Sequence, residues 1–173
     1  MSDVVPAVGQ FHRQLRRVKL LVLDVDGVLT DGRLFYGPRG ETVKAFHVRD
    51  GHGIKAVAKA GITVAIISGR KSQMVAKRAR DLGIRHVFQG VSDKLAVLEK
   101  LAKSRNVTLA ECACVGDDTP DAPILAAAGL GIAVADAHAD ARAAAQLATT
   151  LPGGLGAVRE VCDWLIAARA AVP

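Results

Sequence analysis

Residues 18–32, VKLLVLDVDGVLTDG, determine the kind of fold that this chain can form. Their unbroken aliphatic run predicts a central strand of a parallel sheet that is covered on both faces. The run ends in Asp24 and Asp26, whose side chains share a face because they lie two residues apart in a strand. Ligands of open α/β sheets bind outside the carboxyl ends of the strands. Two carboxylates held together there repel each other unless a cation or a shared proton compensates, so this strand end predicts chemistry.

Strand-like and helix-like segments alternate along the rest of the chain. We expect strands over residues 18–25, 62–69, 86–89, 112–116 and 131–135, and helices over residues 50–60, 72–82, 92–105, 120–128, 138–147 and 156–170. Asp50 is a candidate N-cap of its helix, and Gly61 a candidate stop. Two extended runs around residues 37–40, GPRG, predict a β-hairpin. The repetition predicts an α/β fold with a doubly wound, Rossmann-like parallel sheet, in which the hairpin is the one insertion.

The length and charge of the chain bound its organisation and its partners. With 173 residues it is long enough for one domain and short for two, so we expect a flexible N-terminal segment over residues 1–17 and a single domain over residues 18–173. The formal charge of +6 suits nucleic acid, an anionic membrane or a small anion. Because the basic residues are spread apart from residues 11–19, and the aromatic residues are too few for base stacking, we expect a small phosphorylated substrate and no nucleic acid.

Cysteine usage and hydropathy indicate where the protein works. Cys112 and Cys114 alternate in an apolar run, and with Cys162 they make an odd number without a CxxC motif. Buried free thiols are therefore expected. The sequence shows no secretory signal and no apolar run near 18 residues. We expect a cytoplasmic protein that does not bind a membrane.

Polar residues recur at the later strand ends. The second long strand closes with Ser68, Gly69 and Arg70, a possible phosphate cradle where a helix begins. Lys94 lies at the start of a later helix, opposed to the helix dipole, and residues 116–121, GDDTPD, add three carboxylates. Each feature alone is an ordinary turn, cap or solvated lysine. Together, four sites in chain order point to the same edge of the sheet, which favours a functional site.

The chemistry that fits this set is phosphoryl transfer through an aspartyl intermediate. A carboxylate is a nucleophile toward phosphorus, and Mg²⁺ is the hard, oxygen-binding cation that relieves the repulsion between that nucleophile and a phosphate. One aspartate attacks, while the second protonates the leaving oxygen and later deprotonates the hydrolytic water. The serine hydroxyl, backbone amides and the lysine hold the phosphate oxygens. Gly27 lets the chain turn away after the two acids.

The motifs DVDGVLTDG, ISGR, Lys94 and GDDTPD are similar to motifs one to four of the haloacid dehalogenase-like phosphatases. The resemblance implies that Asp24 is the nucleophile and Asp26 the general acid/base. It further implies a set of binding residues: Asp24, Asp117 and the backbone carbonyl of Asp26 for Mg²⁺, Asp118 and Asp121 in support of the metal, and Ser68, Gly69 and Lys94 for the phosphate. The intervals between the motifs leave no room for a cap domain, so a neighbouring subunit could cover the site.

A closer resemblance covers nearly the whole chain from Val18 onward. LDVDGVLTDG, KAFHVRDGHGI, ISGRKS, GDDTPDAPIL, VADAHADAR and GAVREVCDWL resemble the 3-deoxy-D-manno-octulosonate 8-phosphate phosphatases, which are capless tetramers of lipopolysaccharide biosynthesis. The resemblance implies hydrolysis of that sugar-acid phosphate by a homotetramer. It places further substrate contacts at His47, Val48, Arg49, Asp50, Gly51, Lys55, Arg70 and Arg78.

Three positions depart from that family. His47 stands in place of an asparagine, Lys55 in place of an arginine, and Leu155 in place of an arginine that reaches a neighbouring site. All three concern the choice or release of substrate, and none belongs to the phosphoryl-transfer motifs. A nine-carbon keto-deoxy sugar acid 9-phosphate of the sialic-acid type therefore remains an alternative substrate.

Two functions without catalysis share parts of this pattern. A receiver-like phospho-acceptor shares the parallel sheet, the acidic pair, a hydroxyl and a lysine. There, however, the phosphorylated aspartate precedes the hydroxyl on a middle strand, whereas here the remaining acids follow Lys94. An inactive homologue would have lost one of Asp24, Asp26, Lys94 or Asp117, and all four are present. Both alternatives are disfavoured.

Overall fold

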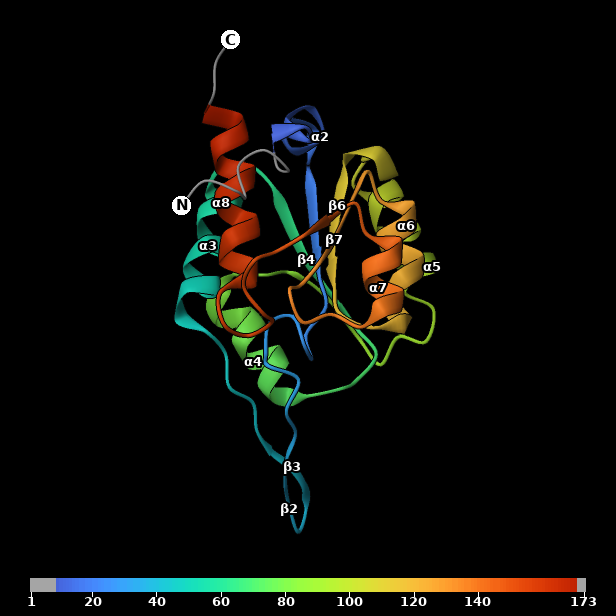
Figure 1. Cartoon of the computed structure of the whole chain (residues 1–173). Coiled ribbons are helices and arrows are strands. Elements are labelled where there is room, and N and C mark those ends of the chain that lie inside the picture. The colour runs from blue at the N-terminus through green and yellow to red at the C-terminus, as the bar shows by residue number, and fades with distance from the viewer. Residues whose placement is uncertain (1–8, 171–173) are drawn as a thin grey trace.

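A six-stranded parallel sheet forms the centre of the molecule. The computed structural model describes residues 9–170. In spatial order the strands are β5 (His86–Gln89), β4 (Thr63–Ser68), β1 (Leu20–Leu23), β6 (Cys112–Gly116), β7 (Leu130–Ala133) and β8 (Leu147–Ala148) (Figure 1). The predicted doubly wound α/β fold is confirmed. The chain moves outward from β1 to β4 and β5 and then returns to β6, so the topological switch point lies beside β1.

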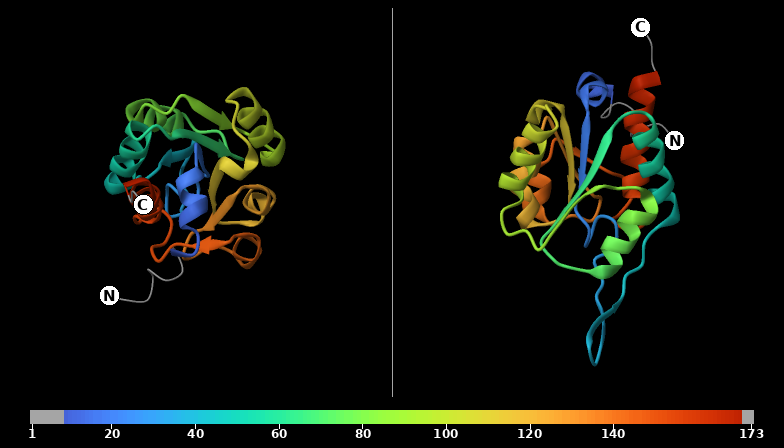
Figure 2. Two further views of the ribbon diagram at one scale, coloured as in Figure 1. Left: turned by 90° about the horizontal axis from the view of Figure 1, so that it is seen from above. Right: turned by 180° about the vertical axis from the view of Figure 1, so that it is seen from behind.

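Helices cover both faces of this sheet (Figures 1 and 2). One layer holds α3 (Val48–Lys59), α4 (Gln73–Leu82) and α8 (Ala157–Ala170), and the other holds α5 (Lys94–Ser104), α6 (Ala122–Ala127) and α7 (Ala139–Ala144). Two short 3₁₀ helices, η1 (Leu109–Glu111) and η2 (Thr119–Asp121), flank β6. Between residues 9 and 170, every helix is too short or too polar to cross a membrane.

The sequence of β1 explains why it lies in the middle. All four of its residues are completely buried, and Leu20 pairs with Thr63 of β4 on one side and with Cys112 of β6 on the other. A strand that is paired on both edges and covered on both faces needs apolar side chains at every position. The backbone N–H of Asp24 then donates to the Val115 carbonyl at 3.1 Å, which carries the pairing to the carboxyl end of the strand.

The predicted β-hairpin is confirmed and is formed by β2 (Phe35–Gly37) and β3 (Gly40–Val43). It projects from the carboxyl edge of the sheet, at the lower end of the molecule in Figure 1. The two strands pair with each other and with no strand of the large sheet. In the described residues, the segment between β1 and α3 contains this hairpin and no cap domain.

The structure differs from the expected flexible segment over residues 1–17. Residues 1–8 lie outside the described part, but α2 (His12–Arg17) is helical and packs on α8. Its Leu15 is only 1% exposed, and the Arg169 guanidinium of α8 donates to the Val18 carbonyl at 2.6 Å. The pattern did not reveal this helix, because one buried leucine among basic residues is too weak a periodic signal.

Asp50 is not the N-cap of α3, which begins two residues earlier with His47 at the cap position. Asp50 is 2% exposed, and its carboxylate accepts the backbone N–H of Arg159, in the first turn of α8, at 2.8 Å. Burial raises the pKa of Asp50, and the hydrogen bonds from α8 oppose that rise. The side chain therefore caps a helix that is distant in sequence. The short strand β8 was also missed: the helix expected over residues 138–147 ends at Ala144, and Leu147 and Ala148 form the strand.

Replacing Asp50 by Ala should destabilise the protein, because the first turn of α8 loses the acceptor for a buried N–H. We expect a loss of about 1–2 kcal/mol in the free energy of unfolding. In thermal melts this corresponds to a decrease of roughly 2–8 °C for a chain of this size. Asp163→Ala is the matched control, because that carboxylate forms only an exposed ion pair with Arg159 at 2.8 Å. Equal losses for the two variants would contradict the capping role.

Candidate active site

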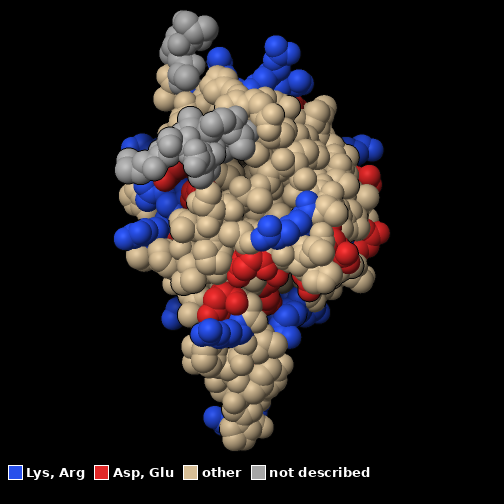
Figure 3. Space-filling model, in the orientation of Figure 1, with Lys and Arg blue, Asp and Glu red and all other residues tan. Residues whose placement is uncertain are grey.

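The polar residues that close the strands meet in one cavity at the carboxyl edge of the sheet. The cavity has a volume of about 200 Å³ and is lined by Asp24, Asp26, Ser68, Gly69, Arg70, Lys94, Asp117, Asp118, Pro120 and Asp121. Figure 3 shows acidic residues gathered just above the base of the hairpin, with basic residues on either side. The structure therefore brings the four predicted motifs together at the switch point of the sheet.

A buried lysine links two of the carboxylates. The Lys94 ammonium donates to Asp24 at 2.8 Å and to Asp121 at 2.6 Å, and all three side chains are nearly inaccessible to solvent. Lys94 is the first residue of α5, and Asp93 caps that helix by accepting the N–H of Ala96. A buried charge is tolerated when it is paired and hydrogen-bonded, so Lys94 and the two acids stabilise one another.

Three carboxylates form a candidate metal site. Oxygen atoms of Asp24, Asp117 and Asp121 lie within 4.8 Å of one another. Asp121 is held in place because its second oxygen accepts the backbone N–H groups of Asp117 at 3.0 Å and Asp118 at 3.3 Å. Asp118 is exposed and accepts the N–H of Thr119 at 2.7 Å. The oxygen-only set suits a hard cation such as Mg²⁺.

The electrostatics of the cluster also fit a divalent cation. Burial, together with repulsion from Asp121, raises the pKa of Asp24 from 3.8 to about 6, although Lys94 opposes the rise. Burial, then repulsion from Asp24 and Asp121, raises the pKa of Asp117 from 3.8 to about 8. One lysine thus leaves the three acids with excess negative charge. A bound dication would favour the ionised carboxylates and remove this repulsion.

Gly27 makes the close approach of Asp117 possible. Its φ is +93°, a left-handed conformation that favours glycine, and a Cβ atom at this position would overlap the Asp117 carboxylate. The glycine that follows Asp26 therefore does more than turn the chain. It leaves room for the carboxylate from the end of β6 to reach the carboxylates from β1.

The segment after β4 provides neutral donors and one cation. Ser68 is buried at the end of the strand, and its hydroxyl accepts the N–H of Arg70 at 3.4 Å. The α4 helix begins only at Gln73, so Gly69 and Arg70 belong to a loop that precedes the helix and not to its first turn. The Arg70 side chain lies 3.6 Å from the Asp26 carboxylate.

The hairpin contributes residues that the sequence did not single out. The ammonium of Lys44 forms an ion pair with Asp26 and a second one with Glu41, at 2.8 Å. Arg70 lies 3.7 Å from Glu41, and its guanidinium donates to the Tyr36 hydroxyl at 3.5 Å. The hairpin itself was predictable. The sequence pattern did not predict which charged side chains of this region point toward the sheet, because that depends on how the hairpin is oriented relative to the sheet.

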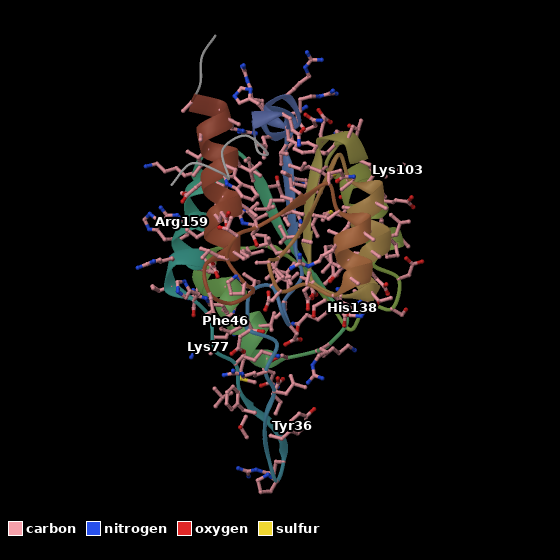
Figure 4. The ribbon with its side chains drawn as sticks, in the orientation of Figure 1. Tyr36, Phe46, Lys77, Lys103, His138 and Arg159 are labelled. Atoms are coloured by element: carbon pink, nitrogen blue, oxygen red, sulfur yellow. The ribbon has the colours of Figure 1, made fainter. Side chains whose placement is uncertain are left out.

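The eight substrate contacts that the resemblance implies do not lie together in one cavity. His47, Asp50, Gly51 and Arg78 border a small cavity beside Phe46, where Arg78 donates to the His47 carbonyl at 3.4 Å and lies 5.8 Å from the centre of the Phe46 ring. Figure 4 shows Phe46 where the chain returns from the hairpin to α3, with His138 on the other side of the molecule.

Three further contacts of this kind, Val48, Arg49 and Lys55, lie on the outer surface of the molecule. Arg49 borders a separate groove of about 420 Å³ that also includes Leu155. Val48 is 78% exposed, and Lys55 is exposed. Of the eight positions, only Arg70 reaches the acidic cavity within a single chain.

Comparisons with known proteins agree with this geometry. Residues 84–152 match the model of the haloacid dehalogenase-like hydrolase family. The chain is 47% identical over 164 residues to the 3-deoxy-D-manno-octulosonate 8-phosphate phosphatase of Escherichia coli K12, covering 95% of this chain and 87% of that one. It is 43% identical over 164 residues to the enzyme of the same name from Yersinia pestis, covering 95% of this chain and 88% of the relative.

A solved structure extends the likeness to three dimensions. The enzyme of that name from Moraxella catarrhalis, in complex with a magnesium ion, a phosphate ion and a KDO molecule, superposes with a TM-score of 0.91 at 43% identity. The match covers 94% of this chain and 93% of that one. The two chains therefore share one fold over nearly their whole length.

Stability should depend on pH and on metal in a linked way. Asp24 and Asp117 have pKa values raised by folding, so their contribution to stability is present at acid pH and is lost as pH rises through about 6 and about 8. Mg²⁺ favours the ionised carboxylates, so millimolar Mg²⁺ should raise the melting temperature more at about pH 8.5 than at about pH 5. KCl at equal ionic strength is the control for screening. A stabilisation by Mg²⁺ that does not change with pH would contradict this assignment.

Gly27→Ala should weaken cation binding by displacing Asp117. We expect a decrease on the order of 10²-fold in Mg²⁺ or Mn²⁺ affinity, since a Cβ would overlap a ligand and demand a left-handed alanine. Isothermal titration with Mn²⁺ measures this directly. Gly83→Ala is the matched control, because Gly83 also has a positive φ but has open space around its Cβ position, far from the acids. Unchanged Mn²⁺ affinity in Gly27→Ala would refute the steric argument.

Proposed function

The chain belongs to the 3-deoxy-D-manno-octulosonate 8-phosphate phosphatases, a family of haloacid dehalogenase-like hydrolases, and we propose that it hydrolyses that sugar-acid phosphate to the free sugar acid and inorganic phosphate with Mg²⁺. The observation that carries the proposal is the Asp24–Lys94–Asp121 network beside Asp117. It holds a carboxylate in a buried, partly neutralised site, which is the environment that attack on a phosphoryl group needs.

The metal would be held by Asp24, Asp117 and the backbone carbonyl of Asp26, with Asp121 and Asp118 in support. When bound, Mg²⁺ neutralises negative charge on the nucleophile and the phosphate and orients the two. Lys94, the Ser68 hydroxyl and the backbone around Gly69 would bind the phosphate oxygens from the protein side. Lys94 is well suited to this, because its buried pairing with Asp24 and Asp121 raises its pKa against the opposing effect of burial, so it stays charged.

Two steps complete the reaction. A carboxylate oxygen of Asp24 attacks phosphorus, the bond from phosphorus to the sugar oxygen breaks, and the leaving oxygen takes a proton from the carboxylic acid of Asp26. Water then attacks phosphorus and gives its proton to the Asp26 carboxylate. The bond from phosphorus to Asp24 breaks, which releases phosphate and restores both aspartates.

The sugar acid carries a carboxylate as well as a phosphate, and the cations around the site suit both groups. Arg70, at the cavity wall, offers a forked donor for a carboxylate. His47, Lys55 and Leu155 differ from the usual residues of the family, and they lie outside this cavity. The nine-carbon 9-phosphate of the sialic-acid type therefore remains the second candidate substrate, with the same catalytic residues.

A homotetramer would complete the site. Leu34, Phe35, Tyr36 and Val43 of the hairpin region are exposed, and several large apolar side chains exposed on one hairpin suit an interface. Arg49 and Arg78, which do not reach the acidic cavity of their own chain, would be free to serve a neighbouring one. Light scattering of the purified protein tests the assembly, and a monomer at micromolar concentration would refute it.

The free thiols support a cytoplasmic location. Cys112, Cys114 and Cys162 are all free and buried. Burial raises the pKa of Cys112 to about 11 and that of Cys162 to about 12, so both remain protonated and unreactive. Unpaired thiols are typical of a reducing compartment.

Phosphate release across three substrates, with Mg²⁺ and with a chelator, tests the proposed function. The eight-carbon keto-deoxy sugar acid phosphate should be hydrolysed with the highest kcat/KM, the nine-carbon analogue less well, and a simple hexose phosphate least, because only the first two carry the carboxylate. Chelation should abolish every activity. A preference for the nine-carbon acid would overturn the assignment of the eight-carbon substrate. No phosphate release from any of the three substrates would overturn the proposed phosphatase function.

Asp24→Asn should abolish turnover while the fold is retained. An amide is a poor nucleophile toward phosphorus, so kcat should decrease by a factor on the order of 10³ or more. The melting temperature should stay within a few degrees of the wild-type value, and circular dichroism checks the fold. Asp118→Asn is the comparison variant, since this exposed carboxylate has only a supporting role and should retain more activity. Appreciable turnover by Asp24→Asn would contradict its role as the nucleophile.

A further inference from the structure

We propose that Lys44 of the hairpin is a positioning residue for the reaction, which holds the Asp26 carboxylate in the direction needed for proton transfer, with Glu41 as the second partner of the lysine. The inference rests on the proposed phosphatase function and deepens it. It makes the hairpin part of the catalytic apparatus of its own chain, in addition to any role in assembly.

The geometry places Lys44 between two acids. Its side chain is 1% exposed, and its ammonium contacts both Asp26 and Glu41, the latter at 2.8 Å. The ammonium is thus paired with two carboxylates, which compensates for its withdrawal from water. Arg70 approaches the same two carboxylates at 3.6 and 3.7 Å, so the four side chains form one network.

A purely structural role is a poor explanation for this network. An ion pair withdrawn from water costs desolvation free energy that its mutual attraction barely repays, so a hydrophobic contact would fasten the hairpin better. Apolar side chains are available, since Leu34, Phe35 and Val43 are present in the hairpin region but remain exposed. The buried lysine instead contacts Asp26, whereas Lys94 binds Asp24, the other aspartate of the pair at the end of β1 (the DxD pair). Each aspartate of the pair thus has its own lysine.

The two lysines bind different aspartates at this strand end. Lys94 holds Asp24 from the α5 side of the cavity, and Lys44 holds Asp26 from the hairpin side. Asp26 has free rotation about its side-chain bonds unless a partner fixes it. Arg70 alone is a weaker constraint, because its side chain is 42% exposed and its nearest nitrogen lies 3.6 Å from the carboxylate. Displacing a proton donor by about 1 Å costs on the order of 10²-fold in rate.

Lys44→Met tests the inference by comparing two leaving groups. The sugar-acid phosphate with the highest kcat/KM in the panel has an alkoxide leaving group, which needs the proton of Asp26. The leaving group of 4-nitrophenyl phosphate is a stable phenolate, which does not need that proton. We expect kcat for the sugar phosphate to decrease about 10–100-fold with little change in KM, and kcat for the aryl ester to decrease less than about threefold. Lys77→Met, an exposed lysine on α4, is the matched control and should match the wild type on both substrates.

A double-mutant cycle shows whether Lys44 acts through Asp26. Adding Lys44→Met to Asp26→Asn should slow the sugar phosphate reaction no further than Asp26→Asn alone, because the group being positioned is already lost. Lys44→Arg, which keeps a cation in reach of both carboxylates, should recover part of the activity. Should Lys44→Met fold poorly, Lys44→Arg and Glu41→Gln, measured on the same two substrates, replace it.

Three results would overturn the inference: equal losses on both leaving groups, additive losses in the cycle, or a Lys44→Met variant that behaves like Lys77→Met. Failure of the proposed function looks different, because the wild-type protein would then release no phosphate from any sugar-acid phosphate.

Discussion

The crowding of three carboxylates at one edge of the sheet is the constraint on which the site depends. Oxygen atoms of Asp24, Asp117 and Asp121 share a space less than 5 Å across, and two of these residues come from strands that neighbour each other in the sheet. Lys94 compensates part of their charge but leaves an excess. The raised pKa values of Asp24 and Asp117 express the residual repulsion, and a dication removes it. The same repulsion that opposes folding of the metal-free site thus provides the affinity for a cation.

Segments that are distant in sequence hold this crowded edge in place. Gly154 donates its N–H to the Val28 carbonyl at 2.9 Å, and a Cβ atom on the neighbouring Gly153 would overlap the carbonyl of Gly27. The loop before α8 therefore packs directly on the turn that follows the DxD pair. Asp50 in turn fixes the start of α8 from the first turn of α3. The turn after Asp26, the loop before α8 and the helices α3 and α8 therefore support one another, although more than a hundred residues separate their parts along the chain.

The hairpin links this unit to the outer surface. Its strands contact each other, its apolar side chains face outward, and its charged residues at the base face the site. One insertion thereby carries exposed apolar side chains and a lysine that contacts Asp26 of the same chain. Arg49 and Arg78, in contrast, border other cavities and do not line the acidic cavity of their own chain.

Local rules acting on the sequence determined the sheet, most of its helices, the hairpin and the convergence of the four motifs. A strand that is covered on both faces can be predicted from its own aliphatic run, without knowing which strands pair with it. The carboxyl ends of parallel strands then meet at one edge of the sheet. Tertiary structure alone decided three contacts: the ion pair of Lys44 with Asp26, the hydrogen bond from the first turn of α8 to Asp50, and the approach of Asp121 to the other candidate ligands. The first two contacts join residues that are 18 and 109 positions apart. At such separations the direction of a side chain follows from tertiary packing and not from the sequence pattern. The α2 helix was missed for the same reason, because the burial of Leu15 exists only once α8 has docked beside it.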